Sequence, residues 1–161
     1  MNPLVSPGPK KFCPGARLHG LVPKREVGDN VAPLPLPSER FNVEIEDLLA
    51  KLRRAPDSVE FEEVQAVIKA QYRYVARAFR NGSADDHVDN AAGSNEGSCR
   101  IFAFARLHGL DKAETLACFG RYYRDDVLGH PQGSDHANIR TFMRHGPDGI
   151  HFAGDALLPV S

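Results

Sequence analysis

The chain has 161 residues, of which 25% are charged, and its formal net charge at neutral pH is −1. This length has room for one domain, and so small a charge provides no basic field for binding nucleic acid or an anionic membrane. No apolar run approaches the roughly 20 residues that span a bilayer. We therefore expect neither nucleic acid nor a membrane as a partner.

The cysteines limit the chemistry further. There are three, Cys13, Cys99 and Cys118, and none is closely spaced with another. This pattern favours neither a disulfide framework nor a cysteine-based zinc site. Lys10 and Lys11 are not followed by the apolar stretch of a signal peptide. We therefore expect a reducing compartment, the cytoplasm, unless the protein is exported by another route.

Proline dominates the first part of the chain. Eight of the twelve prolines fall within residues 3–37, and residues 31–37 read VAPLPLP. Proline blocks helix and favours an extended, polyproline-like course. We therefore predict a disordered tail over residues 1–41 and a folded domain over residues 42–158. The hexapeptide ARLHGL occurs at residues 16–21 and 105–110, but the flanking residues differ, so it does not mark a repeated structural unit.

Helical periodicity begins at Asn42 and ends before Pro56. The apolar stripe of this helix consists of Ile45, Leu48, Leu49 and Leu52. Asp57 and Glu60 then fit a capping box, which predicts a second helix. Its apolar stripe consists of Phe61, Val64 and Ile68, and can be continued through Tyr72, Val75 and Phe79. Because residues 72–79 are rich in aromatics, a strand is an equally open alternative there.

A polar region separates these helices from the next apolar one. Asn81-Gly82 is a turn signal, and residues 83–97 are small and polar. We expect a loop there, with one short strand near Val88 that pairs back to residues 78–80. Residues 99–107 are apolar on nearly every side, which predicts a central, buried helix, and Gly109 ends it.

Two further helices follow the central one. Asp111 and Glu114 form a second capping box, ahead of a helix that ends at Gly129. Its apolar stripe consists of Leu116, Phe119, Tyr123 and Val127. Ser134 or Asp135 caps the last helix, which Gly146 closes and which carries Ile139, Phe142 and Met143. Ile150 and Phe152 alternate with polar or small residues, as in a short strand. The predicted fold is α+β and mostly helical, with about five helices and one or two short strands.

The first candidate for chemistry is the start of the central helix, Asn95-Glu96-Gly97-Ser98-Cys99. Ser98 is a good N-cap, and the free backbone N–H groups of a helix start can bind an anion. A cysteine in the first turn would feel the positive end of the helix, which lowers the pKa of a thiol. Glu96 opposes that effect. We favour the simpler reading, in which Cys99 is a small buried residue.

The second candidate is the start of the last helix, with Asp135, His136, Asn138 and Arg140. His136 and Arg140 are four residues apart and share a helix face. No histidines pair at metal-binding spacing, so we expect no metal, and the sequence indicates no cofactor. Tyr122 stands in an aromatic and arginine-rich run, 121–126, that could stack on bases. The acidic residues that follow it favour a solvated helix face instead.

The folded part of the chain resembles the HopJ type III effector family from about Glu46 to Leu157. The resemblance rests on DLLAKLRRAPDSVEF, on Ala78-Phe79 through Asn81-Gly82, and on three longer stretches: NEGSCRIFAFARLHGL, ETLACFGRYYRDDVLGHPQGSDHANIRTFM and GIHFAGDAL. It implies a single small domain of helices and minor strands. It supplies no catalytic residue, and the family name records association with type III secretion.

Three hypotheses for function follow. The first is an effector that binds an unknown protein or small ligand and is secreted into a host cell. The second is a cytosolic enzyme or small-ligand binder with a pocket between residues 95–99 and 135–140, which would contain Tyr122 and the candidate residues named above. The third is a housekeeping interaction domain that is not secreted. The oligomeric state is not indicated.

Overall fold

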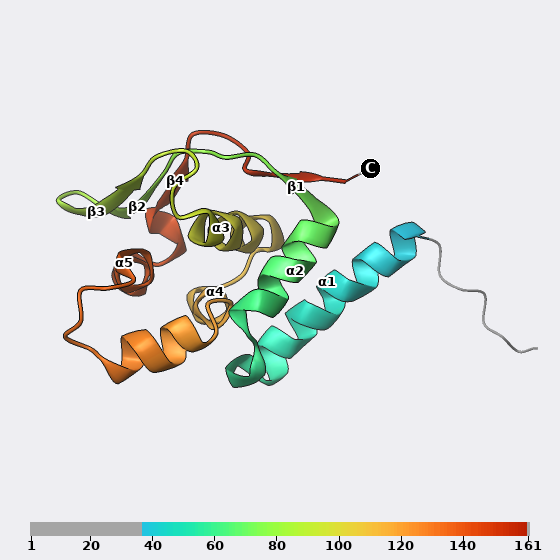
Figure 1. Cartoon of the computed structure of the whole chain (residues 1–161), viewed down its shortest axis with the longest axis horizontal. Helices are drawn as coiled ribbons and strands as arrows, with labels where there is room; N and C mark the ends of the chain where they lie inside the picture. The colour runs from blue at the N-terminus through green and yellow to red at the C-terminus, as the bar shows by residue number, and fades with distance from the viewer. Residues whose placement is uncertain (1–36, 161) are drawn as a thin grey trace, which may run out of the picture. The chain divides into compact units, whose positions relative to one another are not determined.

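Helix α3 (Glu96–His108) lies at the centre of the computed structural model, which describes the backbone of residues 37–160 and side chains from Val43 onward (Figure 1). Ile101 and Phe104 are fully buried, and Phe102 is 2% exposed. Helices α2 and α4 and strand β5 all contact α3. The prediction of a central helix that is buried on nearly all sides is confirmed. Gly109 ends it in a left-handed conformation, with φ of 62°.

Helices α1 (Pro37–Arg54) and α2 (Phe61–Gln71) pack side by side, and α2 packs against α3 (Figure 1). Their predicted stripes are buried at Leu48, Leu52, Val64 and Ile68. Helix α1 begins before Asn42, the predicted start. The rest of the predicted tail, residues 1–36, lies outside the described residues, and its predicted disorder stays a prediction.

The predicted capping box of Asp57 and Glu60 is wrong. Asp57 lies in a short 3₁₀ helix, η1 (Pro56–Ser58), and α2 starts after Glu60 without a side-chain cap. A tertiary contact instead holds the residues just before α2. The guanidinium of Arg124 donates to the Val59 carbonyl and to the Glu60 carboxylate, each at 2.7 Å.

Five short strands form two sheets among the described residues (Figure 1). Strands β1 (Tyr72–Tyr74) and β5 (Leu157–Pro159) pair antiparallel. Strands β2 (Phe79–Ser83), β3 (Asp86–Asn90) and β4 (Ile150–Phe152) form an antiparallel sheet in the order β3-β2-β4. The α+β class is confirmed, with more strands than the pattern indicated. Short strands held by tertiary pairing carry too few residues to show a clear period of two.

The strands settle three local predictions. The helix α2 ends at Gln71, so the strand alternative holds for β1, and residues 75–78 have no regular structure. The strand near Val88 is confirmed as β3, paired with β2. The turn predicted at Asn81-Gly82 is wrong: both residues lie inside β2, and the chain turns at residues 84–85. Asn81 is fully buried, where its amide donates to the backbone of Asn138 at 2.7 Å.

The chain after α3 forms α4 (Lys112–Ala117), a π-helical segment η2 (Tyr122–Val127), α5 (Ala137–His145) and a 3₁₀ turn η3 (Pro147–Gly149). The capping box of Asp111 and Glu114 is confirmed, with hydrogen bonds of 2.8 and 3.0 Å in the two directions. The predicted cap of α5 by Ser134 or Asp135 is wrong. His136 occupies the cap position in a left-handed conformation, and no side chain caps the helix.

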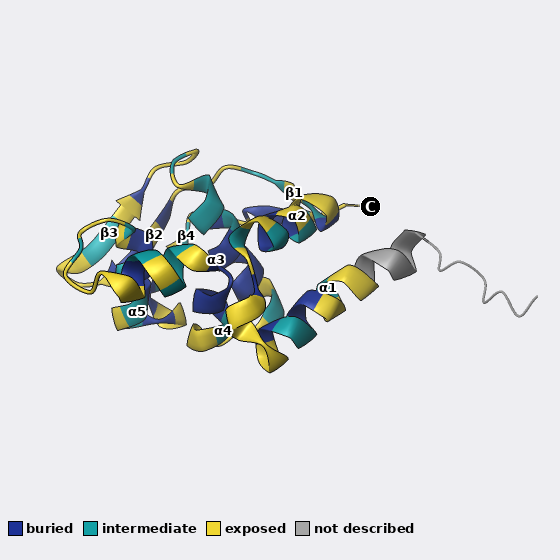
Figure 2. Cartoon of the chain, turned by 60° about the horizontal axis from the view of Figure 1, so that its bottom comes forward, coloured by how far each residue is buried: buried dark blue, intermediate teal, exposed yellow. Residues whose placement is uncertain are grey.

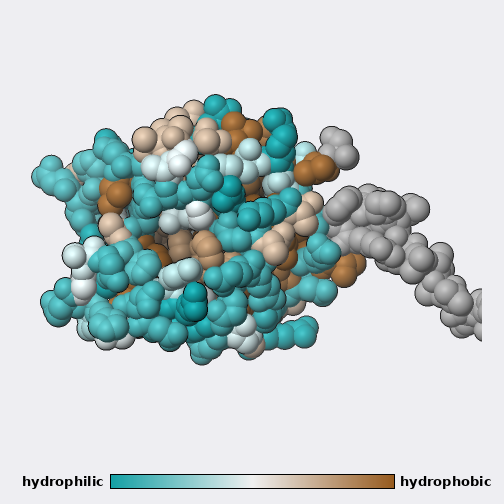
Figure 3. Space-filling model, viewed as in Figure 1, coloured by the Kyte–Doolittle hydropathy of each residue, from teal (hydrophilic) through white to brown (hydrophobic). Residues whose placement is uncertain are grey.

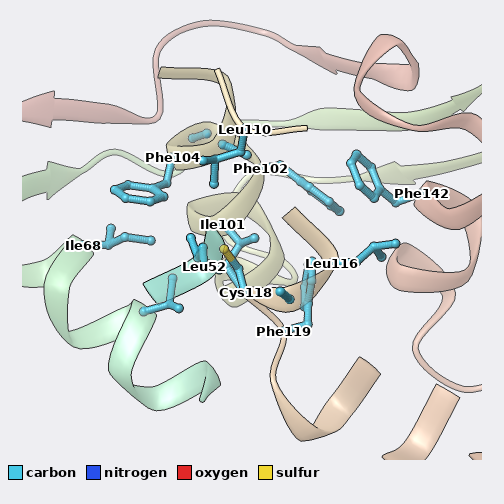
Figure 4. Close-up of a cluster of buried hydrophobic side chains, with 14 of the residues drawn as sticks. Leu52, Ile68, Ile101, Phe102, Phe104, Leu110, Leu116, Cys118, Phe119 and Phe142 are labelled. Carbon is cyan, nitrogen blue, oxygen red and sulfur yellow. The ribbon is translucent and has the colours of Figure 1, made fainter. Parts of the chain in front are cut away.

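Phe102 holds the layers together. Its ring lies 5.5 Å from that of Phe119, 5.0 Å from that of Phe142 and 5.9 Å from that of Phe79 (Figure 4). Buried positions gather on the inward sides of the helices (Figure 2), and the face in Figure 3 is mostly hydrophilic with scattered apolar residues. Within residues 37–160, no helix is both long and apolar enough to cross a bilayer.

The capping box offers a paired test of the local structure. We expect Asp111→Ala to lower the free energy of unfolding by about 1 kcal/mol, because the backbone N–H of Glu114 at the start of α4 loses its acceptor, the Asp111 carboxylate. Asp57→Ala is the matched control and should change it by less than about 0.5 kcal/mol. Urea unfolding of both variants measures the difference. Equal effects would show that the box adds nothing at Asp111.

Candidate functional site

The starts of α3 and α5 meet at one cavity of about 370 Å³. The two segments proposed from the sequence therefore lie on the same side of the domain. The lining residues are Phe61, Val88, Asn95, Gly97, Ser98, Phe119, Tyr122, His136, Ala137, Asn138 and Ile139. Five of them are candidates from the sequence: Asn95, Ser98, Tyr122, His136 and Asn138. We call this space the α3/α5 cavity.

Both helices enter the cavity from a left-handed residue. Asn95 has φ of 48° and His136 has φ of 50°, and neither helix has a side-chain cap. Such backbone is unfavourable for residues other than glycine and tends to occur at functional sites. The first hydrogen bonds back to the cap residues come from the N–H groups of Cys99 and Ile139. The preceding N–H groups of each first turn thus have no acceptor within their helix.

These starts differ from the predicted caps. Ser98 is not the N-cap of α3, because the helix begins at Glu96 and places Ser98 inside the first turn. There Ser98 lines the cavity. Asn95 takes the cap position, but its side chain turns away from the helix and donates to Asn90 at 2.7 Å. The cap is lost because a tertiary hydrogen bond takes the side chain that would have made it.

A network of asparagines supports the cavity from behind. Asn90 and Asn138 exchange two side-chain hydrogen bonds of 3.0 and 2.8 Å, and Asn81 donates to the backbone and side chain of Asn138. Asn81, Asn90 and Asn138 are at most 6% exposed. These buried amides, of which the Asn81 side-chain oxygen alone has no partner, hold the start of α5 against β2 and β3. Asn81 and Asn90 were missed from the sequence, where Asn81 had the signature of a turn residue.

An aromatic wall closes another side of the cavity. The Tyr122 ring lies 5.5 Å from the His136 ring and meets Phe61 edge to face at 5.1 Å. Asp126 accepts a hydrogen bond from Nε2 of His136 at 3.1 Å, which orients the imidazole ring. Tyr122 and Asp126 both belong to the π-helical segment. Such segments are rare and frequent at functional sites.

Three other candidate residues lie beside the cavity without lining it. Glu96 pairs with Arg100 at 3.1 Å. Arg140 donates to the backbone carbonyl and to the carboxylate of Asp135, each at 2.7 Å, and this hydrogen bond lowers the pKa of Asp135. Asp135 and Arg140 therefore brace the loop that carries His136. The charges of Asp135 and Arg140 largely neutralise each other in that ion pair.

Cys99 is buried beneath the start of α3. Its thiol is completely shielded from solvent and lies 3.8 Å from the carbonyl oxygen of Arg77. Burial raises the pKa of the Cys99 thiol. The favoured reading of Cys99 as a small buried residue is confirmed, because desolvation of the thiolate outweighs the lowering of its pKa by the helix start. Cys118 is also buried, and its pKa is raised to about 12 for the same reason.

The far end of α5 is tethered to the β2–β3 hairpin. Arg144 donates to both carboxylate oxygens of Asp86, at 2.7 and 2.8 Å, and His145 contacts the same carboxylate at 2.7 Å. The Arg144 hydrogen bonds hold the pKa of Asp86 well below its usual range. Ser83 contacts the other ring nitrogen of His145 at 3.1 Å. Ser83, His145 and Asp86 thus follow the sequence of contacts of a Ser–His–Asp triad. They lie on the surface, and both oxygens of the Asp86 carboxylate bind Arg144, so we interpret the group as a tether.

The sequence predicted no metal site, because no two histidines have the spacing of metal ligands. Among residues 43–160, no group of three or more histidine, cysteine, aspartate or glutamate side chains is arranged to hold a metal ion. In the α3/α5 cavity the groups available for ligand contacts are backbone N–H groups, the Ser98 hydroxyl and aromatic rings, because the amides of Asn95 and Asn138 are bonded to Asn90. Donors and flat rings of this kind suit an organic ligand with a polar end.

The state of Cys99 can be measured in a chain that also carries Cys13→Ser and Cys118→Ser. We expect iodoacetamide at about pH 8 to alkylate the native protein at least about tenfold more slowly than the same protein in concentrated urea, because the buried thiol has a raised pKa. Mass spectrometry over time gives both rates. Native alkylation as fast as that of the unfolded chain would contradict this account.

Comparisons with known proteins give a family and one solved structure. The family described as HopJ type III effector protein matches residues 45–157. A crystal structure of the unknown-function protein VPA0580 is 47% identical, with a TM-score of 0.68, and the match covers 72% of this chain and 93% of that one. At this identity the likeness includes sequence as well as fold. A search of curated proteins found no match.

Proposed function

The chain belongs to the HopJ type III effector family, and on that premise we propose that it acts by binding a small organic anion in the α3/α5 cavity. One observation carries the proposal: two helix starts without side-chain caps converge on the same cavity. Each start presents backbone N–H groups and the positive end of a helix dipole. Two such ends facing one space favour negative charge there.

The other walls support a ligand with a flat apolar body. Phe61, Tyr122 and His136 present rings, and Val88 and Ile139 add aliphatic surface. Aromatic side chains bind flat groups by offset or edge-to-face contact. A ring attached to a phosphate or carboxylate would place its body against this wall and its charge at the helix starts.

Binding is better supported than covalent catalysis at this site. Cys99 is the nucleophile that the sequence offered at the α3 start, and it is buried, with a raised pKa. The imidazole of His136 is held by Asp126 beside an aromatic ring. Its contacts fix its orientation and make it a recognition element in the wall.

Phenyl phosphate is a suitable probe of this function. We expect saturable binding, seen as changes in the amide signals of Gly97, Ser98 and Ala137 in NMR spectra. Ser98→Asp should abolish it, because the new carboxylate lies where the anion would bind, while an acidic residue in a first turn favours the helix itself. Loss of at least about tenfold in affinity corresponds to roughly 1.4 kcal/mol.

The matched control is Ala113→Asp. It places the same charge in the first turn of α4, at an exposed position that does not line the cavity. This variant should bind phenyl phosphate as the unchanged protein does. If phenyl phosphate does not bind at all, or if both variants weaken it equally, the proposed anion site is wrong.

Export is the second part of the proposal. We infer that residues 1–41 direct secretion, since the matched family is named for type III effectors and its profile leaves these residues outside. Their proline-rich sequence suits a segment that threads a narrow channel. This part is independent of the cavity.

A reporter fused to residues 1–41 tests export directly. We expect the reporter in the medium of cells with a working type III apparatus and not in cells lacking it. A tail of the same composition in scrambled order and a fusion to residues 42–161 are the controls. A reporter that stays inside both strains would leave the cytoplasmic interaction domain as the better reading.

A further inference from the structure

A second cavity, of about 280 Å³, opens at the other end of α3. It lies between the last turn of α3, α4, α5 and β4. The residues that define it are Phe102, Ala105, Arg106, Leu110, Phe142 and Ile150. It shares no lining residue with the α3/α5 cavity.

Its walls are mostly apolar. Phe102, Phe142, Ala105 and Leu110 are all buried core residues, and the first two rings lie 5.0 Å apart (Figure 4). Thr115 also lines the cavity, but its hydroxyl already donates to the Asp111 carbonyl at 2.7 Å. The interior therefore offers apolar contact and little hydrogen bonding.

Arg106 is the single charged side chain that lines this cavity. It is exposed, and it takes part in none of the ion pairs found among residues 43–160. By contrast, Arg100 and Arg140 are paired with carboxylates. A guanidinium that flanks an apolar cavity is complementary to a carboxylate whose body enters the cavity.

The size of the cavity limits the ligand. A dry cavity of about 150 Å³ lined by aliphatic and aromatic residues holds one benzene molecule. A space of about 280 Å³ has room for such a ring and a short chain. Pockets for drug-sized ligands have volumes of about 300–1,000 Å³, so a cavity near the lower end of that range suits a small ligand.

We propose that this cavity binds a small aryl-alkyl monocarboxylate, with its ring against Phe102 and Phe142 and its carboxylate on Arg106. The proposal does not depend on the function assigned to the α3/α5 cavity. The two spaces are, however, close: Phe119 lines the first, Phe102 lines the second, and their rings are 5.5 Å apart. A ligand at the second site therefore contacts the same aromatic layer that backs the first.

The position of Arg106 also has a purely structural explanation. A cation in the last turn of a helix is favoured by the helix dipole without any ligand. The experiment must therefore measure ligand binding in addition to stability.

The probe is 3-phenylpropanoate, with 3-phenylpropanamide as its uncharged match, titrated into the full chain and followed by NMR. We expect saturable binding of the acid, with changes centred on the amides of Gly109, Leu110 and Ile150. The amide should bind at least about fivefold more weakly, and Arg106→Gln should weaken the acid about tenfold, because a charge-assisted contact is lost. Arg73→Gln is the control, since Arg73 is an exposed arginine on β1 that lines neither cavity.

A second variant keeps the test valid if Arg106→Gln does not fold. Ala105→Val adds volume where Ala105 lines the cavity and should reduce binding of the acid while the fold is retained, as shown by unchanged signals from β2 and β3. The proposal is overturned if the acid does not bind, if acid and amide bind equally, or if Arg106→Gln and Arg73→Gln have the same effect. Changes centred on Gly97 and Ser98 instead would place the acid in the first cavity and also overturn it.

Discussion

The burial of the middle of α3, where Cys99 and residues 101–105 are buried, is the constraint on which the other elements depend. A helix can pass through an apolar core because its interior backbone groups bond to one another, but its ends cannot do so. At the C-terminal end, Gly109 turns the chain back, and Leu110 N–H bonds to the Ala105 carbonyl at 2.9 Å. At the N-terminal end, the first N–H groups open into the α3/α5 cavity. The candidate site is thus located where the central helix leaves the core.

The cavity wall is made of backbone that is uncommon elsewhere in proteins. Asn95 and His136 are left-handed, and Tyr122 lies on a π-helical segment. Such conformations persist only when the surrounding structure holds them. Here the holding contacts are specific: the asparagine network behind α5, and the Asp126–His136 hydrogen bond. Their concentration around one cavity is the structural basis for assigning binding to this side of the domain.

The aromatic layer of Phe102, Phe119 and Phe142 separates the two cavities and is shared by them. Helix α5 lines the first cavity at Ala137–Ile139 and the second at Phe142. Because helix α5 and the aromatic layer contact both cavities, they provide a physical route by which a ligand in one cavity could alter binding in the other. The proposed recognition of a small molecule would use this arrangement, and the two cysteines of the described domain, Cys99 and Cys118, are buried.

Much of the fold was predictable because the responsible forces are local. The stripe of α1, the apolar surround of α3, the Gly109 stop and the Asp111 capping box each depend on residues a few positions apart. The strand near Val88 was predictable for the same reason, since it pairs with a neighbour in sequence. The two segments that line the first cavity were also identified as candidates, because each places polar residues at a predicted helix start. That the two segments lie next to each other in space could not be derived from the sequence.

The remaining features were decided by contacts between distant residues. Asn81-Gly82 has the composition of a turn, yet it lies in β2 because Asn138, 57 positions away, takes the Asn81 amide. Asn95 stands where Ser98 was expected as a cap, and His136 where Ser134 or Asp135 was, because Asn90 and Asp126 hold the side chains of Asn95 and His136. Cys99 lost the reactivity of a helix-start thiol because the fold buries it. The sequence by itself determined which segments are helical and which face of each is apolar. The tertiary structure alone decided which polar groups face a cavity, because desolvation and hydrogen bonding depend on neighbours that the local sequence does not specify.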